Sequence, residues 1–218
     1  QEYEGDLYYL GDENEGWAYT GWQFLEVQDD LAEEYDDEEW FYFKPSNGKA
    51  HKADAGQVTR KYIDGKYYSF DENGVMQDKW VVATPGSATG DSARYRADDG
   101  RQETGWVYAY PDNEEDGEDQ FWYYLDSKGV PFNLRGADSG MDEGFLATAQ
   151  KKDNEKWKDP ITGVAAKVIK SKTYLFNDKG VMLTGLYWLS GVHKGTSASP
   201  MTNGYYYFTI DGDHSSVE

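Results

Sequence analysis

Aromatic side chains recur at matching places along the chain, and they are the residues best suited to chemistry. Four aromatic residues each begin a run of aromatic side chains that is followed by a glycine turn: Trp40, Tyr67, Trp122 and Tyr205. Three tryptophans close such units: Trp22, Trp80 and Trp106. Three ring faces around one space attract a quaternary ammonium group through cation–π interactions of about 0.5–2 kcal/mol per ring, and the same faces can stack on sugar rings. We therefore expect several similar binding sites on one surface. The alternative is that the rings only form the core between repeats.

Other residues that could do chemistry form no convincing site. Acidic residues are abundant enough to offer carboxylate pairs for glycoside hydrolysis, but no pair stands out. His51, His193 and His214 lie in polar contexts that are typical of exposed histidines. Residues 112–117 match the first half of a calcium loop, yet Tyr123 occupies the twelfth position, where a bidentate glutamate is required. The sequence therefore predicts no enzyme, no cofactor and no metal site.

The charge balance favours cationic or neutral ligands. The chain of 218 residues has 21 Lys and Arg against 41 Asp and Glu, a net charge of −20. We expect no nucleic-acid partner, because recognition of nucleic acid depends on basic side chains that neutralise phosphates. The alternative is that the charge only keeps an aromatic-rich surface soluble. The chain has no cysteine, which excludes disulfides and thiolate chemistry. No apolar run approaches the roughly 20 residues of a transmembrane helix, so we expect no membrane insertion.

The aromatic runs belong to an internal repeat that must position them. Each copy has strand-forming residues of the type Tyr-Tyr-x-Phe, followed by a turn such as Asp-Glu-Asn-Gly at residues 71–74 and a second strand such as Val75-Met76. An isolated two-stranded hairpin is marginal in water, so the copies must stack on one another. The sequence predicts an all-β, elongated solenoid of stacked β-hairpin repeats with about seven units.

The whole of residues 1–218 is expected to form this single repeat solenoid. The acidic or small-residue inserts between units are expected to be loops. One unit is degenerate, and we include it in the range 150–189. The units are expected at about residues 5–27, 39–63, 64–90, 92–117, 120–145, 150–189 and 203–218.

Residues 66–80 resemble the choline-binding, or cell-wall-binding, repeat of Gram-positive surface proteins, to which glucan-binding repeats are related. The resemblance covers most of residues 5–212. The family combines the opening aromatic and the closing tryptophan of one repeat with an aromatic residue of the next. Carried over, this implies three ligand-binding sets: Tyr67 and Trp80 with Tyr95, Trp22 and Trp40 with Tyr42, and Trp106 and Trp122 with Tyr124.

The chain departs from the family pattern in two units. Ala93 and Arg94 stand where opening aromatics belong, and Thr173 and Leu186 replace an opening aromatic and a closing tryptophan. We therefore expect some of the family's sites to be lost.

The resemblance implies a non-catalytic module that anchors a secreted or cell-surface protein to choline-bearing teichoic acid or to a wall or extracellular polysaccharide. Because the chain is acidic, binding to teichoic acid would have to use its cationic choline groups. The alternatives are an acidic spacer or protein-interaction module without a small ligand, and a glycan-binding region of a hydrolase or toxin. Exposed strand edges make a homodimer through the terminal hairpins plausible.

Overall fold

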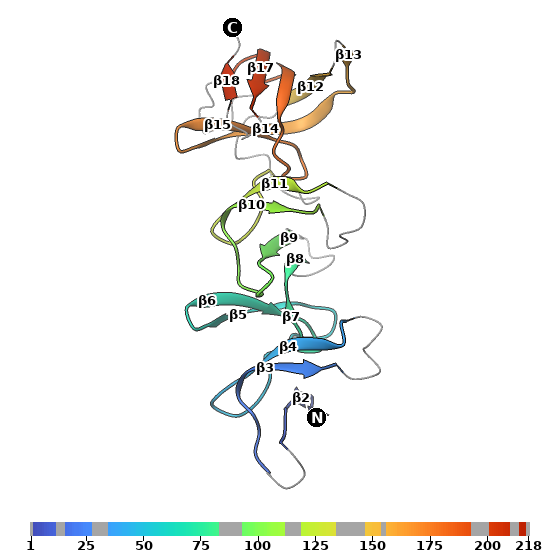
Figure 1. Ribbon diagram of the computed structural model, residues 1–218, viewed down its shortest axis with the longest axis vertical. Helices are drawn as coiled ribbons and strands as arrows, with labels where there is room; N and C mark the ends of the chain where they lie inside the picture. Colours follow the sequence, from blue (N-terminus) through green and yellow to red (C-terminus); the bar gives the residue numbers. More distant parts are fainter. Residues whose placement is uncertain are drawn as a thin grey trace. The chain divides into compact units, whose positions relative to one another are not determined.

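The computed structural model describes residues 2–11, 16–27, 35–82, 93–111, 119–133, 147–153, 156–192, 201–209 and 214–216 (Figure 1). All regular structure in these ranges is β-strand. No helix in them has the length and hydrophobicity needed to cross a membrane. The chain divides into two compact units, residues 1–87 with 93–103 and residues 88–92 with 104–218.

The first unit consists of small antiparallel sheets, most of them hairpins. Strand β1 (Glu2–Tyr3) pairs with β2 (Asp6–Leu7), and β3 (Gly21–Glu26) pairs with β4 (Glu38–Phe43). Strand β5 (Thr59–Ile63) pairs with β6 (Lys66–Phe70), which also pairs with the short β7 (Met76–Gln77). Strand β8 (Lys79–Val82) pairs with β9 (Ala93–Arg96).

The second unit combines one hairpin with a larger sheet. Strand β10 (Gly105–Ala109) pairs with β11 (Phe121–Leu125). The sheet has seven strands in the order β15-β14-β12-β16-β17-β18, with β13 beside β12 (Figure 1). Its strands are β12 (Ala147–Asp153), β13 (Lys156–Trp157), β14 (Ile161–Ile169), β15 (Lys172–Phe176), β16 (Gly185–Ser190), β17 (Gly204–Phe208) and β18 (His214–Ser216).

A glycine turn follows several aromatic strands, and its geometry repeats. After β6, the Gly74 N–H donates to the Asp71 carbonyl, the Asp71 N–H donates to the Val75 carbonyl, and the Asp71 carboxylate accepts from the N–H groups of Asn73 and Val75. The turns at 126–130 and 177–181 repeat this pattern. The glycine has a φ of 83°, which is left-handed backbone that side chains rarely adopt. The predicted turn chemistry is therefore present.

The predicted pairing across this turn is only partly correct. The aromatic strand pairs mainly with the strand that precedes it in sequence, as β6 does with β5 over five residue pairs. Across the glycine turn, β6 makes two pairs with β7, and at Met182 the predicted second strand is reduced to one bridge with Phe176. As a consequence, Trp22, Trp80 and Trp106 do not close the preceding hairpin. Each lies in the first strand of the hairpin that follows.

The all-β prediction is confirmed for the described residues, and the antiparallel hairpins are present. The stacking of about seven units into one solenoid, with the unit boundaries given above, stays a prediction. The calcium-like segment at 112–117 lies outside the described residues.

Candidate aromatic binding sites

Hairpin register brings the predicted aromatic residues together in two places. In β3–β4, Trp22 lies opposite Tyr42, and Trp40 lies two residues away on the same face of β4. In β10–β11, Trp106 lies opposite Tyr124 in the same way. Both first strands begin at a glycine with positive φ, 78° at Gly21 and 79° at Gly105.

Each tryptophan also contacts two rings from a second hairpin of its own unit. We call the resulting groups the first and second aromatic clusters. The first consists of Trp22, Trp40, Tyr42, Tyr68 and Phe70. The second consists of Trp106, Trp122, Tyr124, Tyr174 and Phe176.

The two clusters have nearly the same geometry. The ring centroid of Trp22 lies 6.4 Å from Trp40, 5.1 Å from Tyr42, 4.7 Å from Tyr68 and 6.0 Å from Phe70, with interplanar angles of 82°, 70°, 63° and 28°. The corresponding distances around Trp106 are 6.2, 5.1, 4.7 and 6.0 Å, with angles of 87°, 71°, 64° and 23°. Three edge-on contacts and one stacked contact around a central indole are favourable arrangements for aromatic pairs. The same local structure is therefore built once in each unit.

Burial is graded across both clusters. Phe70 and Phe176 are fully buried and pack with Met76 and Met182, respectively. The central tryptophans are half-buried, whereas Trp40 and Trp122 are 42% and 40% exposed. The inner rings therefore form core between hairpins, while the outer rings remain partly exposed at the surface. The core interpretation applies to the inner rings, and the binding interpretation of the outer rings stays a prediction.

A sixth ring extends each cluster. The His51 N–H donates to the Tyr42 carbonyl (2.9 Å), and the imidazole stacks on Tyr42 with a centroid distance of 5.4 Å and an angle of 9°. In the second cluster, the Phe132 N–H donates to the Tyr124 carbonyl in the same way (2.8 Å). Burial, with Lys44 and Lys61 nearby, lowers the pKa of His51 to about 4, so this histidine is neutral at pH 7. It therefore acts as an aromatic wall rather than a charged group.

The charges around the two clusters differ. Burial raises the pKa values of Tyr42 and Tyr68, and the Asp64 carboxylate adds to both effects. The Asp64 carboxylate and the Lys44 and Lys61 ammonium groups therefore all lie near the first cluster. At the second cluster, the Lys167 ammonium lies 5.8 Å from the Tyr124 ring and 4.7 Å from the Phe132 ring. The chain itself thus places a cation against the second cluster.

The third predicted set is not assembled as expected. Trp80 and Tyr95 are in contact at 4.9 Å and 69°, which matches one pair of each cluster. Tyr67 belongs to the β5–β6 hairpin, where its ring contacts Tyr62 at 4.7 Å and the Arg60 guanidinium at 3.5 Å. The expected place of Trp80 at the end of the hairpin that contains Tyr67 was wrong, because Trp80 begins the next hairpin. The ligand-binding role of Tyr67, Trp80 and Tyr95 stays a prediction.

Sequence reasoning missed the rings that the second hairpin contributes. Tyr68 and Tyr174 each sit one residue after the opening position, and Phe70 and Phe176 sit two residues further on. These residues share one face of their strand, opposite to the face that carries the opening aromatic. The period-2 alternation of the aromatic runs was the signal that could have identified them.

A separate pocket of about 580 Å³ lies beside the β3–β4 hairpin. Phe24, Phe41 and Phe43 contribute apolar walls, while Glu26 and Glu38 contribute acidic ones. Neither Trp22 nor Trp40 lines it, so it is distinct from the first cluster. In the described part of the chain, no group of three or more His, Asp or Glu side chains is placed to hold a metal ion.

Comparison with solved structures returned choline-binding proteins and modular wall enzymes. Choline-binding protein F from Streptococcus pneumoniae is 21% identical over 98% of this chain and 78% of its own, with a TM-score of 0.35. The modular autolysin LytC from Streptococcus pneumoniae, solved with a synthetic peptidoglycan ligand, is 16% identical over 92% of this chain and 34% of its own, with a TM-score of 0.41. The pneumococcal cell-wall endolysin from phage Cp-1, solved with choline, is 17% identical over 64% of this chain and 40% of its own, with a TM-score of 0.29. No protein-family model and no curated protein sequence matched the chain.

Proposed function

We propose that the chain is a non-catalytic module that binds a cell-wall polymer through its two aromatic clusters, with quaternary ammonium groups such as choline as the ligand. The observation that carries this proposal is the duplicate geometry of the clusters. Their ring distances agree to within 0.2 Å and their interplanar angles to within 5°. The outer tryptophan of each copy is about 40% exposed, so the duplicated geometry presents the same partly exposed aromatic surface twice.

The exposed outer tryptophan of each cluster supports a binding role. A ring that served only as core would be buried, whereas the outer tryptophans keep part of their surface in water. Aromatic faces at the surface are suited to binding cations and sugars. The net charge of −20 adds a long-range attraction for cations. These features fit the cationic choline groups of a substituted teichoic acid, whose phosphates the acidic chain would repel, and they fit a secreted or cell-surface protein.

Isothermal titration with choline chloride, with sodium chloride as the ionic control, tests the proposal. We expect saturable binding at two sites. Trp40→Ala and Trp122→Ala remove one exposed ring each, and each should weaken one site by about 3- to 30-fold, which corresponds to the loss of one cation–π contact of about 0.5–2 kcal/mol. Trp17→Ala is the matched control, because Trp17 is 51% exposed but belongs to neither cluster.

Each outcome separates the candidate functions. Unchanged choline binding in both cluster variants would refute the assignment of the sites. If choline does not bind but oligosaccharides do, and the same variants weaken them, the clusters are glycan sites. If neither ligand binds, the acidic spacer or protein-interaction function is favoured.

A further inference from the structure

The place corresponding to an aromatic cluster between hairpins β5–β6 and β8–β9 is occupied by arginines. In β5–β6, Arg60 lies opposite Ser69, as Trp22 lies opposite Tyr42 in β3–β4. Arg94 and Arg96 lie on one face of β9 and occupy the positions that Tyr68 and Phe70 hold in β6. Three of the five aromatic positions have therefore changed to arginine together. Of the other two, Tyr42 is replaced by Ser69, and the outer aromatic remains as Tyr67.

Arg96 is the most buried member of this arginine cluster, which we define as Arg60, Arg94 and Arg96. It is only 1% exposed. Its Nε and Nη2 donate to the Ser69 hydroxyl (3.2 and 2.9 Å), and its Nη1 donates to the Tyr95 carbonyl (3.3 Å). A guanidinium has five N–H donors, so two remain available.

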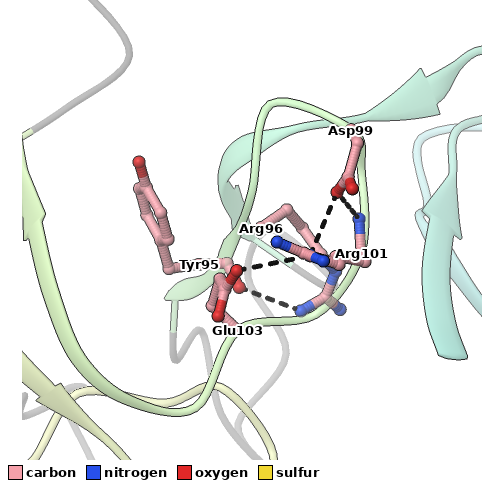
Figure 2. A network of polar contacts seen from close by, with 5 residues as sticks. All are labelled: Tyr95, Arg96, Asp99, Arg101 and Glu103. Atoms are coloured by element: carbon pink, nitrogen blue, oxygen red, sulfur yellow. Dashed lines mark hydrogen bonds and ion pairs between the residues drawn. The ribbon is translucent and has the colours of Figure 1, made fainter.

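Two carboxylates that follow Arg96 in the sequence do not neutralise it. Figure 2 shows that Asp99 and Glu103 pair instead with Arg101, at 3.4 and 3.5 Å. Within the described residues, none of the three cluster arginines forms an ion pair with an acidic side chain. The Nε atoms of Arg60 and Arg94 are buried without a hydrogen-bond partner. Buried donors without acceptors are costly, at about 1–3 kcal/mol each or more when charged.

The electrostatics agree with this geometry. Burial, together with the charges of Arg60 and Arg94, lowers the pKa of Arg96 to about 10. Burial also lowers the pKa of Arg60, and Arg94 contributes in the same direction. The three guanidinium groups therefore repel one another within a chain that is acidic overall.

We propose that the arginine cluster binds a tetrahedral oxyanion, phosphate either as a free ion or as a diester within a polymer. Guanidinium groups match phosphate oxygens through paired N–H donors, and three of them supply more donors than the two oxygens of a carboxylate can accept. Arg60 and Arg94 are only half-buried, which leaves the site accessible from the surface. The Tyr67 ring packs against the Arg60 guanidinium, whose Cζ lies 3.5 Å from the ring centroid.

This site is independent of choline binding, since it shares no residue with the aromatic clusters. It lies in the same unit as the first cluster, and the β5–β6 hairpin contributes to both. One polymer segment with a cationic and an anionic group would thus meet a matching site for each.

The test is titration of the full chain with inorganic phosphate and with dimethyl phosphate, a diester that carries no choline, at low ionic strength and with sodium chloride as the ionic control. We expect saturable binding of phosphate to the wild type, and a rise in the melting temperature that chloride does not reproduce. Arg60→Gln and Arg94→Gln should each weaken phosphate binding at least tenfold. Arg101→Gln is the matched control, because Arg101 is a neighbouring arginine already paired with Asp99 and Glu103.

The results distinguish the possible sources of the anion. Tighter binding of dimethyl phosphate than of phosphate supports a polymer diester, and the reverse supports the free ion. Absence of saturable binding to the wild type would overturn the proposal. So would an equal loss of binding in Arg101→Gln, because it would show a general effect of surface charge. Choline titration of Arg60→Gln keeps this proposal separate from the previous one, since choline affinity at the two clusters should remain within about twofold.

Discussion

Replacing His51 by phenylalanine should make the first unit more stable, and more so as the pH falls. The second aromatic cluster shows that phenylalanine fits this position, because Phe132 makes the same backbone hydrogen bond and packs against Phe176 with a centroid distance of 5.3 Å. His51 stacks on Tyr42 and lies 5.6 Å from Phe70. Its Nδ1 is buried without a hydrogen-bond partner. The substitution therefore removes an unsatisfied polar atom and keeps the ring.

The magnitude follows from the pKa of about 4 in the folded state against about 6.5 in the unfolded state. Between these values the unfolded state binds the proton that the folded state excludes, so the free energy of unfolding decreases as the pH falls from 6.5 towards 4. At pH 5 the loss is at most about 2 kcal/mol. Partial exposure reduces this to about 1–2 kcal/mol. Removal of the unsatisfied Nδ1 adds about 1 kcal/mol at every pH.

Urea unfolding of the wild type and of His51→Phe at pH 7.5 and pH 5.0 provides the test. Burial raises the pKa values of Glu39, Asp71 and Asp78, which stabilises the folded state as the pH falls, so only the difference between the two proteins isolates His51. We expect His51→Phe to be about 1 kcal/mol more stable at pH 7.5 and about 2–3 kcal/mol more stable at pH 5.0. An advantage that does not grow between the two pH values would refute the reasoning.

Three further predictions concern the turns, the second cluster and the core. Gly100→Ala should lower the free energy of unfolding by about 2–4 kcal/mol, because Gly100 has a φ of 75° and an added Cβ would meet the buried Met76 side chain. Gly65→Ala should lower it by only about 1 kcal/mol in the same urea experiment, because Gly65 has a φ of 85° but open space around it. Lys167→Met in a Trp40→Ala background should raise choline affinity at the second cluster several-fold by calorimetry, because it removes a competing cation, and a decrease would show that the lysine supports the site. Phe176→Ala should lower the free energy of unfolding by about 3–5 kcal/mol, and a loss under 1 kcal/mol would contradict its role as core.

Local sequence patterns predicted the local structure well. The turn after Phe70 could be predicted because aspartate, asparagine and glycine satisfy its backbone groups within five residues. The turn depends only on residues near one another in the chain. The grouping of Trp22 with Tyr42 and of Trp106 with Tyr124 came from the family resemblance, and their positions opposite one another in a hairpin were not predicted.

Contacts between hairpins could not be predicted in the same way. The choice of partner for the aromatic strand was wrong because both flanking segments have strand-forming residues, and only packing decides between them. Tyr68 and Tyr174 were missed because the stacking of the hairpins decides which face of each hairpin contacts its neighbour. The sequence analysis noted only that Arg94 replaces an opening aromatic residue. The arginine cluster could not be recognised, because it also requires Arg60, which lies more than 30 residues away in the sequence.

The proposed binding function has a consequence for residence time on a polymer, because each unit carries one aromatic cluster. When one chain of repeated ligands engages both clusters, the second contact forms at an effective concentration set by the polymer, so avidity exceeds either affinity by about 10²–10⁴ when both sites can be reached together. Each contact can then be individually weak and short-lived while the protein stays attached. Free monovalent ligand at high concentration would release it, because it competes at each site as that site opens.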